Sequence, residues 1–320
     1  MEIHADSEVL EVQKLLSSLG WIAGEEVKKI AKAGEGNMNV VLRITTDKRS
    51  FILKQSRSYV QKYPGIAAPI ERIDVEARFY AALETSAISA HLPNIINYKP
   101  DLYLLMIEDL GVVEDLTSIY AQRTISEEAI GKLIEIAHHT HTSGPTASFP
   151  ANLELRRLNH QHIYVLPYKK DNGFVLDDVQ EGLQDIAAPY QDNPQLSAVI
   201  DTMGQEYLSM GTHLIHGDYY PGSWMTIHGQ LYVLDPEFAH IGHREFDLGV
   251  MGAHIMLSTH DAATIQKLLQ LYPDDVSEKK VYQLAGIEIM RRLIGLAQLP
   301  LERTLEEKAH LLEVAKSWIL

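Results

Sequence analysis

Two short stretches carry most of the information on the architecture: residues 214–224 read LIHGDYYPGSW, and residues 231–238 read LYVLDPEF. In each stretch a short apolar strand ends in acidic residues, Asp218 in the first and Asp235 with Glu237 in the second. The two aspartates are 17 positions apart, which allows a hairpin that brings both strand ends to one place. We therefore expect one carboxylate to accept a proton there while the others hold a divalent cation through oxygen ligands.

The rest of the chain divides into a β-rich part and a helical part. Apolar residues recur at helical spacing in two early segments, 8–19 and 73–83. Short β-like runs lie between and after them, at 27–31, 40–44, 50–54, 95–98 and 102–107. After Gly111 the patterns are mostly helical, except for a β-rich interval over 214–234. The sequence predicts an α+β, bilobal fold with a small β-rich N-terminal lobe (1–107), a larger, mostly helical C-terminal lobe (108–320) and a ligand between them.

Composition narrows the class of protein. Among 320 residues, 43 Asp+Glu outnumber 28 Lys+Arg, and there is no cysteine. The formal charge of −15 argues against a nucleic-acid partner, which requires a concentrated basic face, and the lack of cysteine excludes disulfides and thiolate zinc sites. No apolar run reaches the ~18 residues that span a bilayer, and the polar start of the chain lacks the layout of a signal peptide. We expect a cytoplasmic protein without a membrane or nucleic-acid partner that acts on a small molecule.

Residues 33–40, AGEGNMNV, form a glycine-rich stretch between two predicted strands. Glycine lets the backbone approach a ligand closely, and the exposed N–H groups of such a turn suit phosphate oxygens. The stretch lacks the following helix and the Gly-Lys-Ser/Thr of a P-loop, so it does not match that motif. On its own it is better explained as an ordinary hairpin turn.

A lysine interrupts an apolar strand, because Lys54 lies in the run FILKQ over 51–55. Burying an ammonium without a partner is costly, and Glu76 on the following helix is a candidate partner. Protein kinases hold a strand lysine with a helix glutamate and direct it at nucleotide phosphates. The alternative, an edge lysine that reaches solvent and a solvated glutamate, remains equally open from these residues.

These motifs resemble the aminoglycoside phosphotransferase/choline kinase family, small-molecule kinases with a protein-kinase-like fold, and within it the branch of the 5-methylthioribose kinases. Four stretches carry the resemblance: GEGNMN at 34–39, IHGD at 215–218 with Gly222 and Ser223, DPEFA at 235–239, and GIEIMRRLIGLA at 286–297. Ser223 stands where most of the wider family has asparagine. The methylthioribose kinases also have serine at this position. The matching segments run from near Val27 to Ala297, so the resemblance covers most of the chain.

The resemblance implies ATP as the phosphate donor and Mg²⁺ as its metal. It implies a loop over the phosphates, a lysine that contacts them, a glutamate that orients the lysine, and adenine contacts at the hinge; these nucleotide-binding residues are Gly34, Gly36, Asn37, Asn39, Lys54, Glu76, Glu108 and Leu110. It also makes Asp218 the catalytic base at the acceptor hydroxyl, and it makes Asp235, Glu237 and Ser223 the metal ligands. Asp247 is better explained as a structural residue that braces the catalytic loop.

The resemblance assigns Arg291 and Arg292, on a predicted C-terminal helix, to the acceptor. Adjacent helix residues point about 100° apart, so only one of the two faces the cleft squarely, and the residues do not determine which one. The alternative is one surface arginine and one salt-bridged arginine. If both face the site, they repel a polycationic acceptor and suit sugar hydroxyls together with the negative charge that develops during transfer.

Two further polar groups allow a functional and a structural interpretation. His138 and His141 invite a metal site, but no carboxylate stands at zinc-like spacing, so core or cap histidines are favoured. The segment 158–164, LNHQHIY, either lines the acceptor pocket or fastens the helices around it, and the structural interpretation is slightly favoured.

The combined prediction is an ATP-dependent small-molecule kinase that transfers the γ-phosphate to a hydroxyl of a small acceptor, best matched by 5-methylthioribose or a related sugar. Two alternatives stay open within the family, an aminoglycoside-type antibiotic kinase and a kinase of another small alcohol. A nucleotide-binding pseudokinase regulator is the remaining alternative, and Ser223 is its only hint. The resemblance also implies a homodimer.

Overall fold

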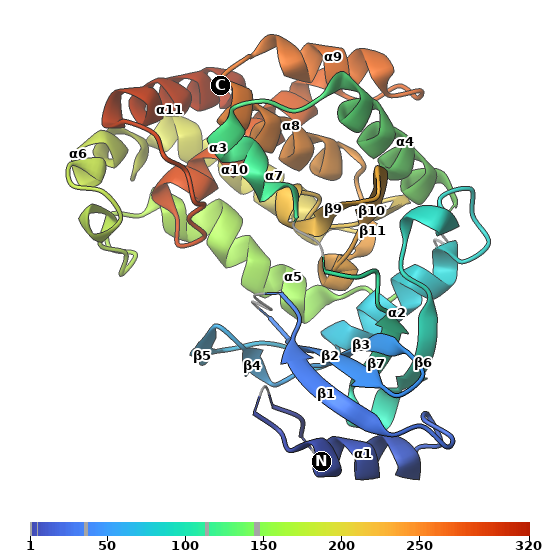
Figure 1. The fold of residues 1–320 in the computed structure, drawn as a ribbon. Helices are drawn as coiled ribbons and strands as arrows, with labels where there is room; N and C mark the ends of the chain where they lie inside the picture. The colour runs from blue at the N-terminus through green and yellow to red at the C-terminus, as the bar shows by residue number, and fades with distance from the viewer. Residues whose placement is uncertain (1, 5, 35–37, 113–114, 144–147) are drawn as a thin grey trace.

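The computed structural model describes residues 2–4, 6–34, 38–112, 115–143 and 148–320. The chain forms two lobes: a small lobe built on a β-sheet, which holds the N-terminus, and a larger helical lobe, which holds the C-terminus (Figure 1). This arrangement confirms the predicted α+β, bilobal architecture. Within the described ranges, no helix is long and apolar enough to cross a lipid bilayer.

The sheet of the small lobe is antiparallel throughout, with its strands in the order β1-β2-β3-β7-β6. The five strands are β1 (Val27–Lys32), β2 (Val40–Thr46), β3 (Ser50–Gln55), β6 (Ile95–Lys99) and β7 (Leu104–Glu108). A hairpin of β4 (Tyr59–Val60) and β5 (Tyr63–Ala67) is inserted after β3. Helix α1 (Val9–Ser18) packs on one face of the sheet, and helix α2 (Arg72–Leu83) packs on the other.

The alternation of side chains along β3 sets the position of the strand lysine. Phe51 and Leu53 pack into the apolar cluster beneath α1, whereas Ile52 packs with residues of α2 on the opposite face. Lys54 is two positions after Ile52, so it also points toward α2, the helix that carries Glu76. The strand pattern and the helix after it therefore bring the lysine and the glutamate together.

The large lobe is built around two helices, α8 (Glu245–Thr259) and α10 (Glu278–Ile294), which pack against each other. Residues 246–258 and 283–294 are buried without exception, as expected of helices that neighbours surround on all sides. The other helices of this lobe are α3 (Ile119–Gln122), α4 (Glu127–Ser143), α5 (Leu153–His160), α6 (Leu183–Ala187), α7 (Pro194–Leu208), α9 (Ala263–Leu271) and α11 (Leu305–Ile319). A π-helical turn, Gln161–Val165, continues α5.

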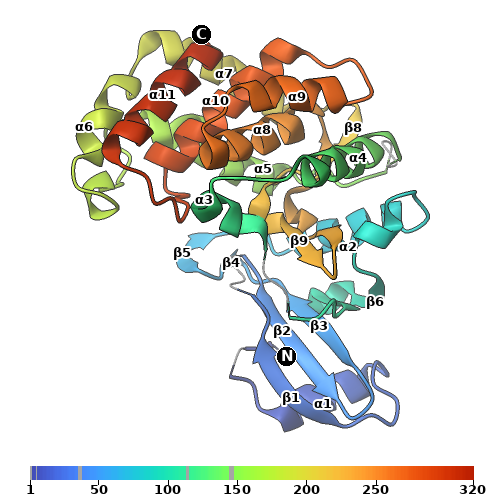
Figure 2. The same cartoon turned by 45° about the horizontal axis from the view of Figure 1, so that its top comes forward.

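The large lobe also contains two short ladders, and Figure 2 shows β9 (Trp224–Ile227) of one of them between the sheet of the small lobe and the helices. The ladders pair β8 (His213–Ile215) with β11 (His240–Gly242), and β9 with β10 (Gln230–Val233). The predicted hairpin of the strands that end at Asp218 and Asp235 is not formed: β8, before Asp218, pairs with β11, and β10, before Asp235, pairs with β9. Gly217 has a φ of +81°, and a Cβ there would lie 2.3 Å from the carbonyl oxygen of Phe238. The backbones of the two turns thus approach as closely as only glycine permits.

One strand begins later than predicted. The β-like run over 102–107 becomes a strand only from Leu104, because Pro100–Leu102 forms a single 3₁₀ turn. Tyr103 then adopts a left-handed conformation with a φ of 49°, which reverses the chain into β7. The remaining predicted strands and early helices agree with the structure to within about two residues, the usual uncertainty of element ends.

Candidate active site

A buried aspartate holds the backbone of the loop after β8. Asp247, near the start of α8, accepts hydrogen bonds from the backbone N–H groups of His216 (2.7 Å) and Gly217 (2.9 Å). His141 Nε2 lies 3.1 Å from the same carboxylate. Burial would raise the pKa of Asp247, but the hydrogen bond and charge of His141 lower it below its ordinary value. The prediction that Asp247 braces this loop is confirmed.

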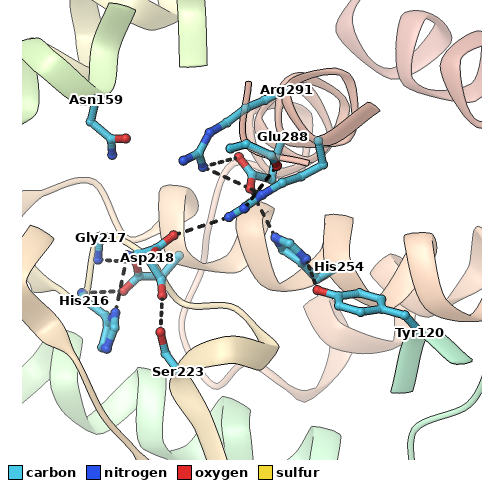
Figure 3. Close-up of polar contacts among 12 residues, drawn as sticks. Tyr120, Asn159, His216, Gly217, Asp218, Ser223, His254, Glu288 and Arg291 are labelled. Carbon is cyan, nitrogen blue, oxygen red and sulfur yellow. Dashed lines mark hydrogen bonds and ion pairs between the residues drawn. The ribbon is translucent and has the colours of Figure 1, made fainter. Parts of the chain in front are cut away.

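Asp218 is the next residue of this loop (Figure 3). Its backbone carbonyl accepts a hydrogen bond of 3.0 Å from the hydroxyl of Ser223, and its backbone N–H donates to His216 Nδ1 at 3.3 Å. One carboxylate oxygen lies 3.6 Å from Nη2 of Arg292. Burial raises the pKa of Asp218 above its ordinary value, against the opposing charge of Arg292. The backbone of Asp218 is therefore held in place, and one guanidinium faces its carboxylate.

On β3 of the small lobe, Lys54 pairs with two carboxylates. Its ammonium lies 2.6 Å from Glu76, which is 1% exposed, and it also forms an ion pair with Asp235. Burial would lower the pKa of Lys54, but the charges of Asp235 and Glu76 raise it well above its ordinary value. The predicted Lys54–Glu76 contact is present, and the alternative of an edge lysine in solvent is wrong. The contact with Asp235 joins the sheet of the small lobe to the second acidic turn.

Glu237 is buried and contacts residues of the small lobe. Asn39 of the glycine-rich stretch donates a hydrogen bond of 2.8 Å to its carboxylate, and Nε of Arg72 lies 3.4 Å away. Burial raises the pKa of Glu237 to about 8, while the charge of Arg72 lowers it. Gly34 has a φ of +73° with open space around it; Gly36 and Asn37 lie outside the described residues. The structure thus brings the glycine-rich stretch and the DPEF turn together through Asn39.

The predicted hinge residues lie at the end of β7. The carboxylate of Glu108 accepts a hydrogen bond of 2.7 Å from Asn94, and Leu110 is half-buried. Between them, Asp109 forms an ion pair of 2.9 Å with Nε of Arg43 on β2. Burial would raise the pKa of Asp109, but the hydrogen bond from Arg43 lowers it below its ordinary value. This pair fastens the link between the lobes to the sheet. Sequence reasoning missed it, because the partners are 66 positions apart.

Both arginines of α10 are buried. Nη1 of Arg291 lies 3.0 Å from Glu288, and Nε of Arg292 lies 2.6 Å from the same carboxylate. The alternative that one of them is a surface arginine is wrong, because Glu288 stands three and four positions earlier and pairs with both. Only Arg292 contacts Asp218. Its guanidinium also stacks 4.8 Å from the ring centre of Tyr220.

Sequence reasoning missed the residues that hold these arginines. Glu288 is the one charged residue in the buried stretch 284–290 of α10, which is otherwise apolar, and that isolation is the signal that could have identified it. His254 on α8 contacts Glu288 through Nε2 (3.1 Å) and the Tyr120 hydroxyl through Nδ1 (2.6 Å). Sequence reasoning also missed Arg72 on α2, a fully buried arginine that contacts Glu237.

The two candidate histidines of α4 contact protein side chains, and Nε2 of the half-buried His138 lies 3.2 Å from Asp274. His141 is buried between Asp247 and the hydroxyl of Tyr272, which confirms a core histidine rather than a metal ligand. The part of the chain that the structure describes contains no cluster of three metal-binding His, Asp or Glu side chains. In the segment 158–164, the amide of Asn159 donates to the hydroxyl of Tyr207, which agrees with the favoured structural interpretation.

Comparison with known proteins places this geometry in a family. The chain matches the model of the phosphotransferase enzyme family over residues 29–278. It is 24% identical to a methylthioribose kinase of Bacillus velezensis, over 95% of this chain and 90% of that protein. Its fold is similar to that of a choline kinase from Streptococcus pneumoniae, with 14% identity, coverage of 97% and 98%, and a TM-score of 0.54. It is also similar to an ADP-bound aminoglycoside phosphotransferase, with 13% identity, coverage of 98% and 100%, and a TM-score of 0.53.

These similarities confirm the protein-kinase-like fold and the predicted reaction type, a nucleotide-dependent phosphotransfer to a hydroxyl of a small molecule. The match to the family model extends from β1 to the first residue of α10, so it includes the strand lysine and both acidic turns. From this match and from the fold, the chain belongs to the phosphotransferase enzyme family.

Proposed function

We propose that this chain is an ATP-dependent kinase of a small, sugar-like acceptor, with 5-methylthioribose as the first candidate. One observation carries the proposal: Arg292 lies 3.6 Å from the carboxylate of Asp218 and belongs to a buried pair with Arg291. A hydroxyl that approaches Asp218 also comes within reach of the Arg292 guanidinium. A guanidinium donates hydrogen bonds to oxygen atoms, which suits an oxygen-rich neutral acceptor. The methylthioribose kinase similarity over 95% of the chain supports the same acceptor.

The nucleotide is assigned to the small lobe, 1–107, and its border with the large lobe, 108–320. The phosphates would meet Lys54, which Glu76 orients across 2.6 Å, under the loop that contains Gly34, Gly36, Asn37 and Asn39. The adenine would contact the backbone around Glu108 and Leu110, at the end of β7. This arrangement requires the ion pair between Lys54 and Asp235 to loosen when phosphates enter.

The second acidic turn fits Mg²⁺. This ion usually takes one or two protein carboxylates and fills its other positions with phosphate oxygens and water. Asp235 offers a carboxylate that is 50% exposed, and Glu237 offers another two positions later in the same turn. Ser223, whose hydroxyl proton is donated to the carbonyl of Asp218, has oxygen lone pairs left for the third contact. Bound Mg²⁺ would neutralise the charge of the phosphates during transfer.

The chain's own residues would then act by position and charge. Asp218 would orient the acceptor hydroxyl and take its proton, and its direction is fixed by the loop that Asp247 holds. Lys54 would keep the phosphates in line with that hydroxyl. Arg292 stands next to the carboxylate and would stabilise the negative charge that spreads over the transferred group.

A coupled ADP-release assay with Mg-ATP tests this function. The acceptor panel is 5-methylthioribose, ribose, choline, homoserine and kanamycin, and we expect saturable turnover with 5-methylthioribose. Turnover with choline, homoserine or kanamycin in its place would refute the acceptor and leave the kinase. ATP binding without turnover on any acceptor would favour the pseudokinase. Light scattering of the same preparation tests the homodimer.

A further inference from the structure

Helix α10 buries an anion at its centre. Glu288 is 2% exposed, and residues 283–294 around it are all buried. A carboxylate in such surroundings is costly unless its oxygens are paired. The contacts of Glu288 therefore show what the buried charge does.

Three side chains donate to this carboxylate. Arg291 places Nη1 at 3.1 and 3.0 Å from its two oxygens, and Arg292 places Nε at 2.6 Å. His254 places Nε2 at 3.1 Å. Burial would raise the pKa of Glu288, but the two arginines lower it well below its ordinary value, so the group is an anion.

An ionised Glu288 determines the tautomer of His254. Burial lowers the pKa of His254 to about 4, so the imidazole is neutral near pH 7. Because Glu288 only accepts, Nε2 carries the proton and Nδ1 accepts from the Tyr120 hydroxyl at 2.6 Å. Hydrogen bonds therefore run from α3 through α8 to the carboxylate on α10, as Figure 3 shows.

The position of Arg292 follows from this chain of contacts. A guanidinium is a rigid plane, so holding its Nε also fixes the direction of its Nη2. In Arg292, Nε is held by Glu288, Nη2 points to Asp218 at 3.6 Å, and the ring of Tyr220 covers one face. Glu288 also balances one of the two arginine charges, which leaves a single net positive charge in this cluster.

We propose that Glu288 is a positioning residue of the acceptor site. It holds Arg291 and Arg292 in the orientation in which they meet the acceptor, and His254 and Tyr120 anchor it. Among the residues that the structure describes, its side-chain contacts are with Arg291, Arg292 and His254, so it acts through the arginines. This inference rests on the proposed function, because it concerns the acceptor side of that same site.

The Glu288→Gln variant tests the proposal by steady-state kinetics. Its amide keeps the shape but cannot neutralise two guanidinium groups, so we expect the acceptor KM to rise by about tenfold or more. That tenfold rise corresponds to about 1.4 kcal/mol of lost interaction with the acceptor. The KM for ATP should stay within about twofold, because Glu288 acts through arginines on the acceptor side. The control is Glu206→Gln, which removes an ion pair to Lys280 on the same helix but away from the site. An unchanged acceptor KM in folded Glu288→Gln protein would overturn the inference and leave the proposed function in place.

A second measurement needs no acceptor. In wild-type protein with labelled arginines, the Nε–H of Arg292 is buried against Glu288, so its NMR signal should exchange slowly with water. Glu288→Gln should accelerate that exchange, and unchanged exchange would refute the positioning role. If the wild-type protein turns over none of the panel, the proposed function fails, and this signal still decides the inference.

If Glu288→Gln does not fold, Tyr120→Phe replaces it as the test. This change removes one hydroxyl and leaves every charge in place. The proposal expects a rise of roughly threefold in the acceptor KM with an unaltered KM for ATP, since one neutral hydrogen bond is lost. Equal acceptor KM values in this variant and the wild type would contradict it.

Discussion

Arg72 and Glu288 are buried charges of opposite sign, one on α2 of the small lobe and the other on α10 of the large lobe. Arg72, on α2, donates to the backbone carbonyls of Arg57 and Met38 at 2.6 Å and lies 3.4 Å from Glu237. Glu288, on α10, receives hydrogen bonds only from side chains, two of them guanidinium groups. The buried cation therefore organises backbone on the proposed nucleotide side, whereas the buried anion organises side chains on the proposed acceptor side.

This difference has a consequence for specificity. All nucleoside triphosphates present the same phosphate groups. Backbone groups that a buried arginine holds in place do not change with side-chain identity, so they suit such an invariant part of the ligand. Acceptors differ, and side chains held by a buried carboxylate can be exchanged without moving the backbone. We therefore expect substitutions around Arg72 to alter nucleotide binding, and substitutions around Glu288 to alter acceptor binding.

The largest effect is expected from Asp218→Ala, which removes the proposed catalytic base. Loss of a positioned base should lower kcat by about 10²- to 10⁴-fold, while ATP affinity stays nearly unchanged. Steady-state kinetics and a nucleotide titration measure the two quantities separately. Normal turnover in this variant would remove Asp218 from the mechanism. A parallel loss of ATP affinity would show that Asp218 also contributes to nucleotide binding, against the proposed division of the site.

Arg72→Met should destabilise the protein by about 3–5 kcal/mol, because it leaves Glu237 and several carbonyls without their buried partner. The KM for ATP should rise more than the acceptor KM. Chemical denaturation and two-substrate kinetics give these values. The control is Arg78→Met on the same helix, where an exposed ion pair with Asp74 contributes little. A change confined to the acceptor KM would break the proposed contrast.

Acid should weaken the acceptor-side anchor through His254. Its pKa of about 4 in the folded protein lies below the ordinary 6.5, so the unfolded chain binds the extra proton more readily. The resulting stability is fully present above pH 6.5 and is lost as the pH falls toward 4, by up to about 3 kcal/mol. Denaturation curves at pH 7.5, 5.5 and 4.5 should show a smaller loss in His254→Gln. Equal losses in both proteins would mean that His254 does not titrate in this range.

Ser223→Ala should have the smallest effect, since Ser223 makes one hydrogen bond to the loop between the two sides. Loss of that bond should lower the free energy of unfolding by about 1 kcal/mol. If Ser223 also binds Mg²⁺, the concentration of Mg²⁺ required for half-maximal turnover should rise several-fold. A variant with altered stability but an unchanged Mg²⁺ requirement would leave Ser223 as a structural residue alone.

Much of the site follows from local sequence patterns. The strand ends with Asp218 and Asp235, the strand lysine and the glutamate on the next helix were all predicted. In the structure the lysine pairs with the glutamate and with Asp235. These patterns depend on residues a few positions apart, such as alternation along β3 or a glycine where two backbones nearly touch. The orientation of Arg291 and Arg292 was not predicted, because helix geometry alone does not include the buried Glu288 as their partner.

The bilobal fold, the reaction type and the acidic turns could thus be inferred from strand and helix periodicity and from a few motifs. Only the tertiary structure shows which buried charges meet. Glu237 pairs with Asn39 from 198 positions away, and His254 joins Tyr120 across 134 positions to reach Glu288. Periodicity indicates that a residue is buried but does not identify its partner. The partner is determined by the packing of distant elements, because a buried charge is stable only where that packing supplies its counter-charge and hydrogen bonds.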